Sequence, residues 1–125
     1  MNTTSAARIL LVEDDAPTRE LTEDIFRSRG YEVEAVADGE AALELVVADQ
    51  RFDLLVTDIG LPGMSGLELI SRIRGEGINL RILLMSGYEG PETHEREGST
   101  LGATVLVKPF NLRDLLSAVE RATNA

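Results

Sequence analysis

The sequence predicts an α/β fold in which helices cover both faces of a parallel sheet. Short apolar runs end abruptly at polar residues, amphipathic stretches lie between these runs, and the two kinds of segment alternate five times along the 125-residue chain. This alternation predicts a single domain with five strands and five helices. Because crossovers between parallel strands are right-handed, the sheet is expected to be open and doubly wound.

The first strand and helix are predicted at residues 9–12 and 17–29. The strand is a short apolar run followed directly by acidic residues, which is typical of a buried strand. In the next segment Leu21 and Ile25 recur at helical spacing. Gly30 is expected to end this helix as a C-cap residue.

The second strand and helix follow at once. Residues 31–36 alternate apolar with acidic side chains and predict a more exposed strand. Asp38 is expected to cap a helix that runs to about Ala48. The third strand, residues 54–57, is again an apolar run, and Asp58 comes directly after it.

Residues 60–66 are predicted to form a loop because they contain glycines and a proline. Ser65 and Glu68 have the spacing of a capping box, which predicts a helix from there to about Arg74. Residues 80–85 are predicted to form a fourth strand of the buried type.

The segment from residue 89 to residue 101 has little apolar character, and we expect a short or mobile helix there. Residues 104–107 predict the fifth strand. Asn111 and Asp114 are spaced to open a last helix. Its expected buried stripe consists of Leu112, Leu115, Leu116 and Val119.

Composition and charge exclude several classes of function. The chain has no cysteine, which excludes disulfides, thiolate metal sites and cysteine nucleophiles. Its formal net charge of -10 argues against nucleic acid or an anionic membrane as a partner. The first eight residues lack the hydrophobic core of a signal peptide, and the apolar runs are too short to cross a bilayer. A cytoplasmic protein that inserts into no membrane is therefore expected.

Chemically reactive side chains collect at the ends of the predicted strands. Glu13 and Asp14 follow the first strand, Asp58 the third, Ser86 the fourth and Lys108 the fifth. Each residue taken alone is ordinary, because acids and serines are common in turns and lysines on surfaces. In an open parallel sheet, however, ligands bind beyond the carboxyl ends of the strands. These side chains are therefore expected to converge on one functional edge.

The expected cluster fits the chemistry of phosphoryl transfer. Clustered carboxylates need a cation, and oxygen ligands without thiolates or imidazoles favour Mg²⁺. A carboxylate such as Asp58 is a possible nucleophile toward phosphorus. Mg²⁺ and Lys108 would neutralise the charge that spreads during transfer, and Ser86 would supply a hydrogen bond.

Several segments together resemble the receiver domain of bacterial response regulators of two-component systems, including chemotaxis receivers. They are residues 9–15 (ILLVEDD), 53–58 (DLLVTD), 61–66 (LPGMSG), 85–87 (MSG) and 107–110 (VKPF). The resemblance runs from about residue 8 to residue 121. It implies a flavodoxin-like sheet with strand order 2-1-3-4-5. We expect a disordered tail at residues 1–7, a receiver domain at 8–122 and a C-terminal tail at 123–125.

The resemblance also implies a role for each residue of the cluster. Asp58 would accept a phosphoryl group from a phosphohistidine of a histidine kinase or a histidine phosphotransfer protein. Asp14, Asp58 and the backbone carbonyl of Gly60 would bind Mg²⁺, and Glu13 would act through a water molecule. Ser86 and Lys108 would bind the phosphoryl group, and Pro109 would follow a cis peptide bond. The chain would be a phosphorylation-dependent switch, not a turnover enzyme.

Two positions depart from or refine the family pattern. Val105 stands where family members usually carry a Tyr or Phe, which puts the usual aromatic switch in doubt. Tyr88, two residues after Ser86, is expected to lie over the phosphoryl site and slow the attack of water. The run from Met85 to Tyr88 also resembles receivers of hybrid sensor kinases, so a stand-alone receiver and a domain of a longer protein both fit. A monomer or weak homodimer is expected.

Other functions fit the sequence less well. A binding module that keeps the fold without phosphorylation would not need the full set of site residues, although Val105 favours it mildly. An aspartate-based phosphatase would need a second acid two residues after Asp58, where the chain has Gly60. No glycine-rich nucleotide loop is present. His94, the single histidine, lies in a glutamate-rich segment that is more typical of a solvated surface than of a phosphodonor.

Overall fold

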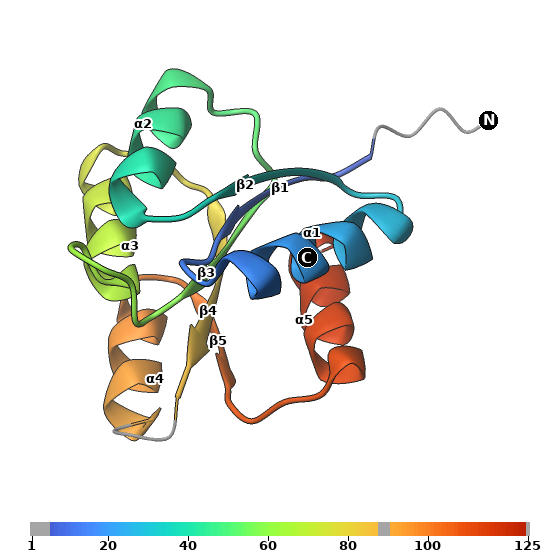
Figure 1. Cartoon of the computed structure of the whole chain (residues 1–125). Coiled ribbons are helices and arrows are strands. Elements are labelled where there is room, and N and C mark those ends of the chain that lie inside the picture. The colour runs from blue at the N-terminus through green and yellow to red at the C-terminus, as the bar shows by residue number, and fades with distance from the viewer. Residues whose placement is uncertain (1–5, 88–90, 125) are drawn as a thin grey trace.

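The computed structural model describes residues 6–87 and 91–124, which form a five-stranded parallel sheet and five helices (Figure 1). The elements are β1 (Arg8–Val12), α1 (Ala16–Ser28), β2 (Glu32–Val36), α2 (Gly39–Ala48), β3 (Leu54–Asp58), α3 (Gly66–Gly75), β4 (Arg81–Ser86), α4 (Pro91–Thr100), β5 (Thr104–Val107) and α5 (Leu112–Asn124). The strand order is β2-β1-β3-β4-β5. The predicted fold class and strand order are confirmed.

Two apolar cores lie on the two faces of the sheet. Successive side chains of a strand point to opposite faces. Leu10 and Val12 therefore belong to the core covered by α2 and α3, whereas Ile9 and Leu11 belong to the core covered by α1 and α5. Figure 1 shows this division, with α4 on the same side as α2 and α3. The strands are apolar at nearly every position because both faces are covered.

The helix boundaries follow the predicted capping residues. Asp38 and Ser65 each accept a hydrogen bond from the backbone amide three positions later, at 2.8 and 3.1 Å. Asn111 and Asp114 cap one another's backbone amides reciprocally. Gly30 has a φ of 91°, the left-handed conformation expected after a helix end. Each such cap contributes about 1 kcal/mol, so local sequence explains where these helices begin and end.

Two leucines on the predicted apolar stripes are exposed, Leu21 to 62% and Leu112 to 47%. Phe26 anchors α1 and is fully buried. Leu21 lies five residues earlier, which places it about 140° away around the helix. Leu112 is the first residue of α5, and its exposure shows that the predicted buried stripe is wrong at that position. Leu115 and Val119 farther along the helix are buried as predicted.

The weakly predicted segments are partly described. α4 occupies Pro91–Thr100, so a helix forms where a short or mobile one was expected. Residues 1–5 and Tyr88 lie outside the described residues, and the predictions for the N-terminal tail and for Tyr88 stay predictions. Residues 123 and 124 were expected in a tail but belong to α5, where the Thr123 hydroxyl donates to the Val119 carbonyl. Among the described residues, no helix has the length and apolar character needed to cross a membrane.

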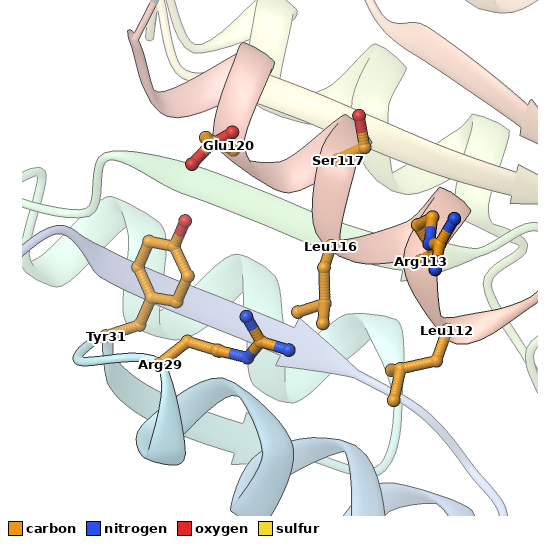
Figure 2. A pocket seen from close by; sticks show the side chains of 7 residues that line it. All are labelled: Arg29, Tyr31, Leu112, Arg113, Leu116, Ser117 and Glu120. Carbon is orange, nitrogen blue, oxygen red and sulfur yellow. The ribbon is translucent and has the colours of Figure 1, made fainter.

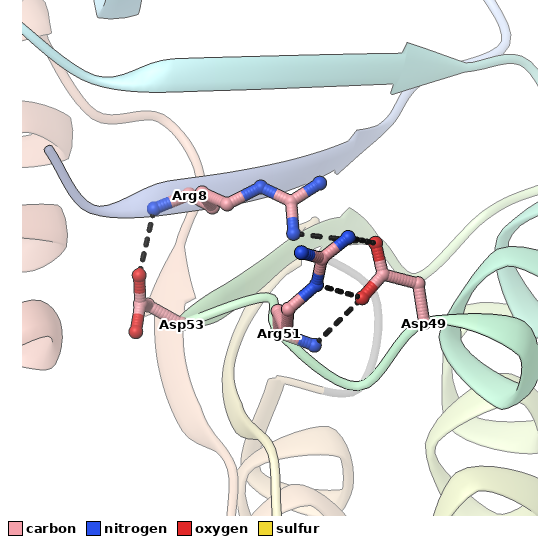
Figure 3. Close-up of polar contacts among 4 residues, drawn as sticks. All are labelled: Arg8, Asp49, Arg51 and Asp53. Atoms are coloured by element: carbon pink, nitrogen blue, oxygen red, sulfur yellow. Dashed lines mark hydrogen bonds and ion pairs between the residues drawn. The ribbon is translucent and has the colours of Figure 1, made fainter. Parts of the chain in front are cut away.

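Charged residues are paired at the amino ends of the strands (Figure 3). The backbone amide of Arg8 donates to Asp53 at 2.8 Å, and the Arg8 guanidinium contacts Asp49 at 3.3 Å. Arg51 Nε donates to Asp49 at 2.9 Å. The hydrogen bonds from Arg51 hold the pKa of Asp49 well below its usual range. The Arg8 guanidinium also lies 4.6 Å above the centre of the Phe52 ring. Each carboxylate of this cluster therefore accepts a hydrogen bond from an arginine residue.

Candidate functional site

The carboxyl ends of the strands meet at the opposite edge of the sheet and carry the predicted site residues. Asp58 is the last residue of β3, and Ser86 is the last residue of the neighbouring β4. Ser86 pairs in register with Val107 at the end of β5, and Lys108 follows directly. Glu13 comes immediately after β1. Parallel pairing thus brings residues that are far apart in the sequence to one edge.

Asp58 and Lys108 form an ion pair at the centre of this edge. The distance between Lys108 Nζ and Asp58 Oδ2 is 2.8 Å, and the Asp58 side chain is 14% exposed. The other oxygen, Oδ1, is 3.5 Å from the Gly60 amide nitrogen, at the long limit for a hydrogen bond. Asp58 therefore has one oxygen held by a cation and one that is weakly held.

A backbone hydrogen bond next to the site connects the end of β5 to the end of β4. The Lys108 backbone amide donates to the Ser86 carbonyl at 2.6 Å. The Ser86 side chain is fully buried, and its hydroxyl lies 3.4 Å from the Gly87 carbonyl oxygen. The Lys108–Pro109 peptide bond is cis, as the family resemblance implies. Ser86 and Lys108 are thus adjacent through the backbone as well as through the sheet.

Glu13 is a buried acid beside Asp58, only 8% exposed. Burial raises the pKa of Glu13, the hydrogen bond from the Asp15 amide lowers it, and the negative charge of Asp58 raises it again. Arg19 donates to the backbone carbonyl of Glu13 at 2.9 Å and so holds this turn in place. Asp14, next in the chain, is exposed. The edge therefore carries more negative charge than Lys108 neutralises.

Gly66 is a residue of the site that the sequence did not single out. A Cβ at this position would lie 2.3 Å from the Asp58 carbonyl oxygen and 2.9 Å from Ile59 Cα. The Gly66 amide donates to the Ile59 carbonyl at 2.9 Å. Only glycine lets the first turn of α3 pack this closely on the backbone after Asp58. The available signal was a glycine directly after the predicted cap Ser65.

The donor atoms at this edge fit a magnesium ion. Glu13, Asp14 and Asp58 offer carboxylates, and Gly60 offers a backbone carbonyl, all of them the hard oxygen ligands that Mg²⁺ prefers. Among residues 6–87 and 91–124, no three acidic or histidine side chains form a metal-binding group by themselves. A bound Mg²⁺ would therefore rely on the carbonyl and on water, as Mg²⁺ usually does.

Val105 lies in β5, three residues before Lys108. It is half-buried in β5 and packs against the core that α2 and α3 cover. No aromatic side chain occupies its position, so the structure keeps the departure from the family pattern that the sequence indicated.

A cavity of about 540 Å³ in the described part of the chain is not at this edge. It lies between α5 and the junction of α1 with β2 (Figure 2), and is lined by Arg29, Tyr31, Leu112, Arg113, Leu116, Ser117 and Glu120. The lining residues do not include Asp58 or Lys108. This cavity is therefore separate from the edge that carries Asp58 and Lys108.

Comparison with known proteins agrees with this geometry. The response regulator receiver domain family matches residues 9–120. Sporulation initiation phosphotransferase F of Bacillus subtilis is 34% identical over 115 residues, which cover 91% of each chain. The response regulator protein FleR of Pseudomonas aeruginosa is 40% identical over 116 residues, but the chain spans only 24% of that protein. The structure of the chemotaxis protein CheY4 of Vibrio cholerae aligns with a TM-score of 0.83 at 35% identity, over 94% of this chain and 98% of that one.

The family match gives the chain a function as well as a fold. Receiver domains are signalling modules rather than turnover enzymes, they generally use Mg²⁺, and they imply a histidine kinase or phosphotransfer protein as partner. The match covers almost the whole chain, and the relatives include short proteins of similar length. The chain therefore belongs to the response regulator receiver family and is a phosphoaccepting switch of a two-component or phosphorelay system.

Proposed function

We propose that Asp58 is the phosphoacceptor of this receiver and that Lys108, Ser86 and a magnesium ion assist the transfer. The observation that carries the proposal is the 2.8 Å contact between Lys108 Nζ and Asp58 Oδ2 at the carboxyl edge of the sheet. A cation on one oxygen leaves the other oxygen, Oδ1, to act as the nucleophile.

In the proposed reaction, Asp58 Oδ1 attacks the phosphorus of a phosphohistidine on the donor protein. A phosphorus–oxygen bond forms and the phosphorus–nitrogen bond breaks. The electron pair of the broken bond stays on the imidazole, which takes up a proton from solvent. Lys108 lies beside the carboxylate and offsets the charge that spreads over the phosphoryl oxygens. The Ser86 hydroxyl, at the end of the neighbouring strand, donates a hydrogen bond to one of those oxygens.

The magnesium ion would be held by Asp14, Asp58 and the backbone carbonyl of Gly60, with Glu13 bound through a water molecule. When bound, it would supply positive charge that offsets the repulsion among the carboxylates and would orient the phosphoryl group for in-line attack. Glu13 is buried, and burial and the charge of Asp58 raise its pKa. Both observations support the proposal that a positive charge binds here.

The phosphodonor in this proposal is a histidine kinase or a histidine phosphotransfer protein in the cytoplasm. The receiver acts as a monomer or weak homodimer, and Tyr88 slows hydrolysis of the aspartyl phosphate. A receiver that binds partners without being phosphorylated is the alternative, because Val105 replaces the usual aromatic residue. The ion pair between Lys108 and Asp58 favours the phosphorylated switch.

The test is to incubate the protein with Mg²⁺ and acetyl phosphate and to measure its intact mass. Wild type should gain one phosphoryl group, and Asp58→Asn should gain none. Asp53→Asn is a matched control, because Asp53 directly precedes the same strand at its amino end and accepts a hydrogen bond from the Arg8 backbone amide. This control should gain the phosphoryl group like wild type. No gain in wild type, or a gain that survives Asp58→Asn, would show that the proposal is wrong.

A further inference from the structure

Three acidic residues in a row, Glu13, Asp14 and Asp15, follow β1, but the structure uses them in different ways. Asp15 is the N-cap of α1, and its carboxylate accepts hydrogen bonds from the backbone amide and the hydroxyl of Thr18. That carboxylate is therefore engaged by the helix. The carboxylates of Glu13 and Asp14 remain for the edge that carries Asp58.

Arg19, the fourth residue of α1, binds both ends of this acidic turn. Its backbone amide donates to the Asp15 carbonyl at 2.8 Å, and its guanidinium Nη1 donates to the Glu13 carbonyl at 2.9 Å. The first bond belongs to the ordinary helical pattern. The second is a charge-assisted bond to a carbonyl six residues away. Asp14 lies between the two carbonyls in the chain, so Arg19 closes a loop around a proposed ligand of Mg²⁺.

The bond from Arg19 completes the support of Glu13. The Glu13 amide donates to the Val36 carbonyl at 3.0 Å, and one carboxylate oxygen of Glu13 accepts from the Asp15 amide at 3.0 Å. The Glu13 carbonyl accepts from Arg19. Because Glu13 is buried, a carbonyl without this bond would have to turn toward water. Arg19 therefore determines where the backbone of the turn lies.

Arg19 would affect a cation at this edge in two opposite ways. Its positive charge would repel Mg²⁺ and weaken binding, although Arg19 is half-buried and water screens part of the repulsion. Its hydrogen bond would hold the carboxylates of Glu13 and Asp14 in place and strengthen binding. Residues that orient the ligands of a metal ion change its affinity about 10-fold to 100-fold. The orienting effect should therefore be the larger one.

We propose that Arg19 is a positioning residue that raises the affinity of the carboxyl edge for Mg²⁺ by fixing the turn that carries Glu13 and Asp14. The inference rests on the proposed function, because it assumes the magnesium site described there. In this proposal Arg19 contacts neither the metal ion nor the phosphoryl group, and it acts through the backbone of Glu13.

The probe is Mg²⁺ alone, added to the folded protein without a phosphodonor. NMR titration of the backbone amides of residues 13–15 gives its dissociation constant. Arg19→Met keeps a side chain of similar length but removes the charge and the hydrogen-bond donors, and it should weaken Mg²⁺ binding about 10-fold. If the charge of Arg19 were its main effect, the same variant would bind Mg²⁺ more tightly. The direction of the change therefore separates the two effects.

Arg27→Met is the matched control. Arg27 lies on the same helix and is exposed, but it pairs with Glu23 at 2.6 Å and donates to the Val33 carbonyl. Its substitution removes one positive charge from α1 without altering the acidic turn, so the affinity for Mg²⁺ should stay as in wild type. Arg19→Lys keeps the charge but has one flexible donor group in place of the planar guanidinium, and it should weaken binding only about threefold.

Phosphorylation by acetyl phosphate distinguishes positioning from a general loss of structure. In Arg19→Met the Mg²⁺ concentration that gives half the maximal rate should rise about 10-fold, whereas the rate at saturating Mg²⁺ should stay close to that of wild type. A damaged fold would lower the saturating rate as well. If Arg19→Met does not fold, Arg19→Lys compared with Arg27→Lys decides the question by the same two measurements.

The outcomes keep the role of Arg19 apart from the proposed function. If wild type binds no Mg²⁺, the magnesium site fails, and the role of Arg19 fails with it. If wild type binds Mg²⁺ but Arg19→Met binds it as tightly or more tightly, the role of Arg19 is overturned while the site at Asp58 stands. The role is also overturned if Arg27→Met weakens binding as much as Arg19→Met does.

Discussion

The two ends of the sheet arrange their charges in opposite ways. At the amino ends of the strands, Asp49 accepts hydrogen bonds from Arg51 and contacts Arg8, and its pKa lies well below the usual range. At the carboxyl ends, burial and the charge of Asp58 raise the pKa of Glu13 instead. Acidic side chains are thus paired with arginines at the amino ends of the strands, whereas at the carboxyl ends they lie beside one another.

This difference separates a structural use of charge from a functional one. Paired acids such as Asp49 favour the folded state as it stands. The acids around Asp58 share one lysine and gain from any cation that binds among them. Under the proposed function, this crowding of acids favours the binding of a magnesium ion at the carboxyl edge. Because the two ends can be altered separately, the contrast can be tested by substitution.

The largest expected effect is on phosphorylation after the loss of Lys108. Lys108→Ala removes the cation from Asp58 and should slow phosphorylation by acetyl phosphate about 100-fold, the usual effect of losing one charge-stabilising donor. Arg51→Ala removes a cation from the paired end and should leave the rate unchanged. The rates are measured from the mass gain over time. Equal rates for the two variants would show that the two ends do not differ as described.

The second prediction concerns the backbone that carries Asp58. Gly66→Ala would place a methyl group against the Asp58 carbonyl and should lower the free energy of unfolding by about 1–3 kcal/mol. Gly75→Ala, at the other end of α3, meets no atom within 4 Å and should be neutral or stabilising by up to about 1 kcal/mol. Urea denaturation measures both. If Gly66→Ala were as stable as Gly75→Ala, the close packing on Asp58 would be wrong.

A third prediction concerns metal binding without any phosphodonor. Mg²⁺ at ten times its dissociation constant should stabilise the wild-type fold by about 1.4 kcal/mol. Asp14→Asn should lose most of this gain, because it removes a proposed ligand. Asp49→Asn should keep it, since Asp49 lies at the paired end. Thermal denaturation with and without Mg²⁺ gives the answer, and a loss of the gain in Asp49→Asn would count against a site at the carboxyl edge.

The smallest effect is a pH dependence at the paired end. The pKa of Asp49 lies below the ordinary value of 3.8, so its stabilising contribution is complete above that value and is lost as the pH falls toward the pKa in the folded state. Between about pH 5 and pH 2, wild type should therefore lose more stability than Asp49→Asn does. Scanning calorimetry at several pH values would show that the difference between the melting temperatures of the two proteins shrinks as the pH falls. A difference in melting temperature that stays constant with pH would mean that Arg51 does not stabilise the charged form of Asp49.

The strands and the reactive edge could be predicted because they depend on local patterns. Apolar runs mark the buried strands, and parallel pairing then places Asp58, Ser86 and Lys108 at one edge. The role of Gly66 could not be predicted, because it depends on a backbone segment that only the fold brings close. The exposure of Leu112 was missed for a related reason, since periodicity gives the face of a helix but not where its packing partner ends.

Locating the phosphoryl group on the chain tests the role of the carboxyl edge most directly. The protein is treated with Mg²⁺ and acetyl phosphate, the acyl phosphate is reduced with borohydride, and the peptides are analysed by mass spectrometry. Reduction converts a phosphorylated aspartate to homoserine. If Asp58 is the phosphoacceptor, this product is expected at position 58 alone. Conversion at Asp14 or at an acid of the paired end, or no conversion under conditions that phosphorylate the protein, would contradict that role.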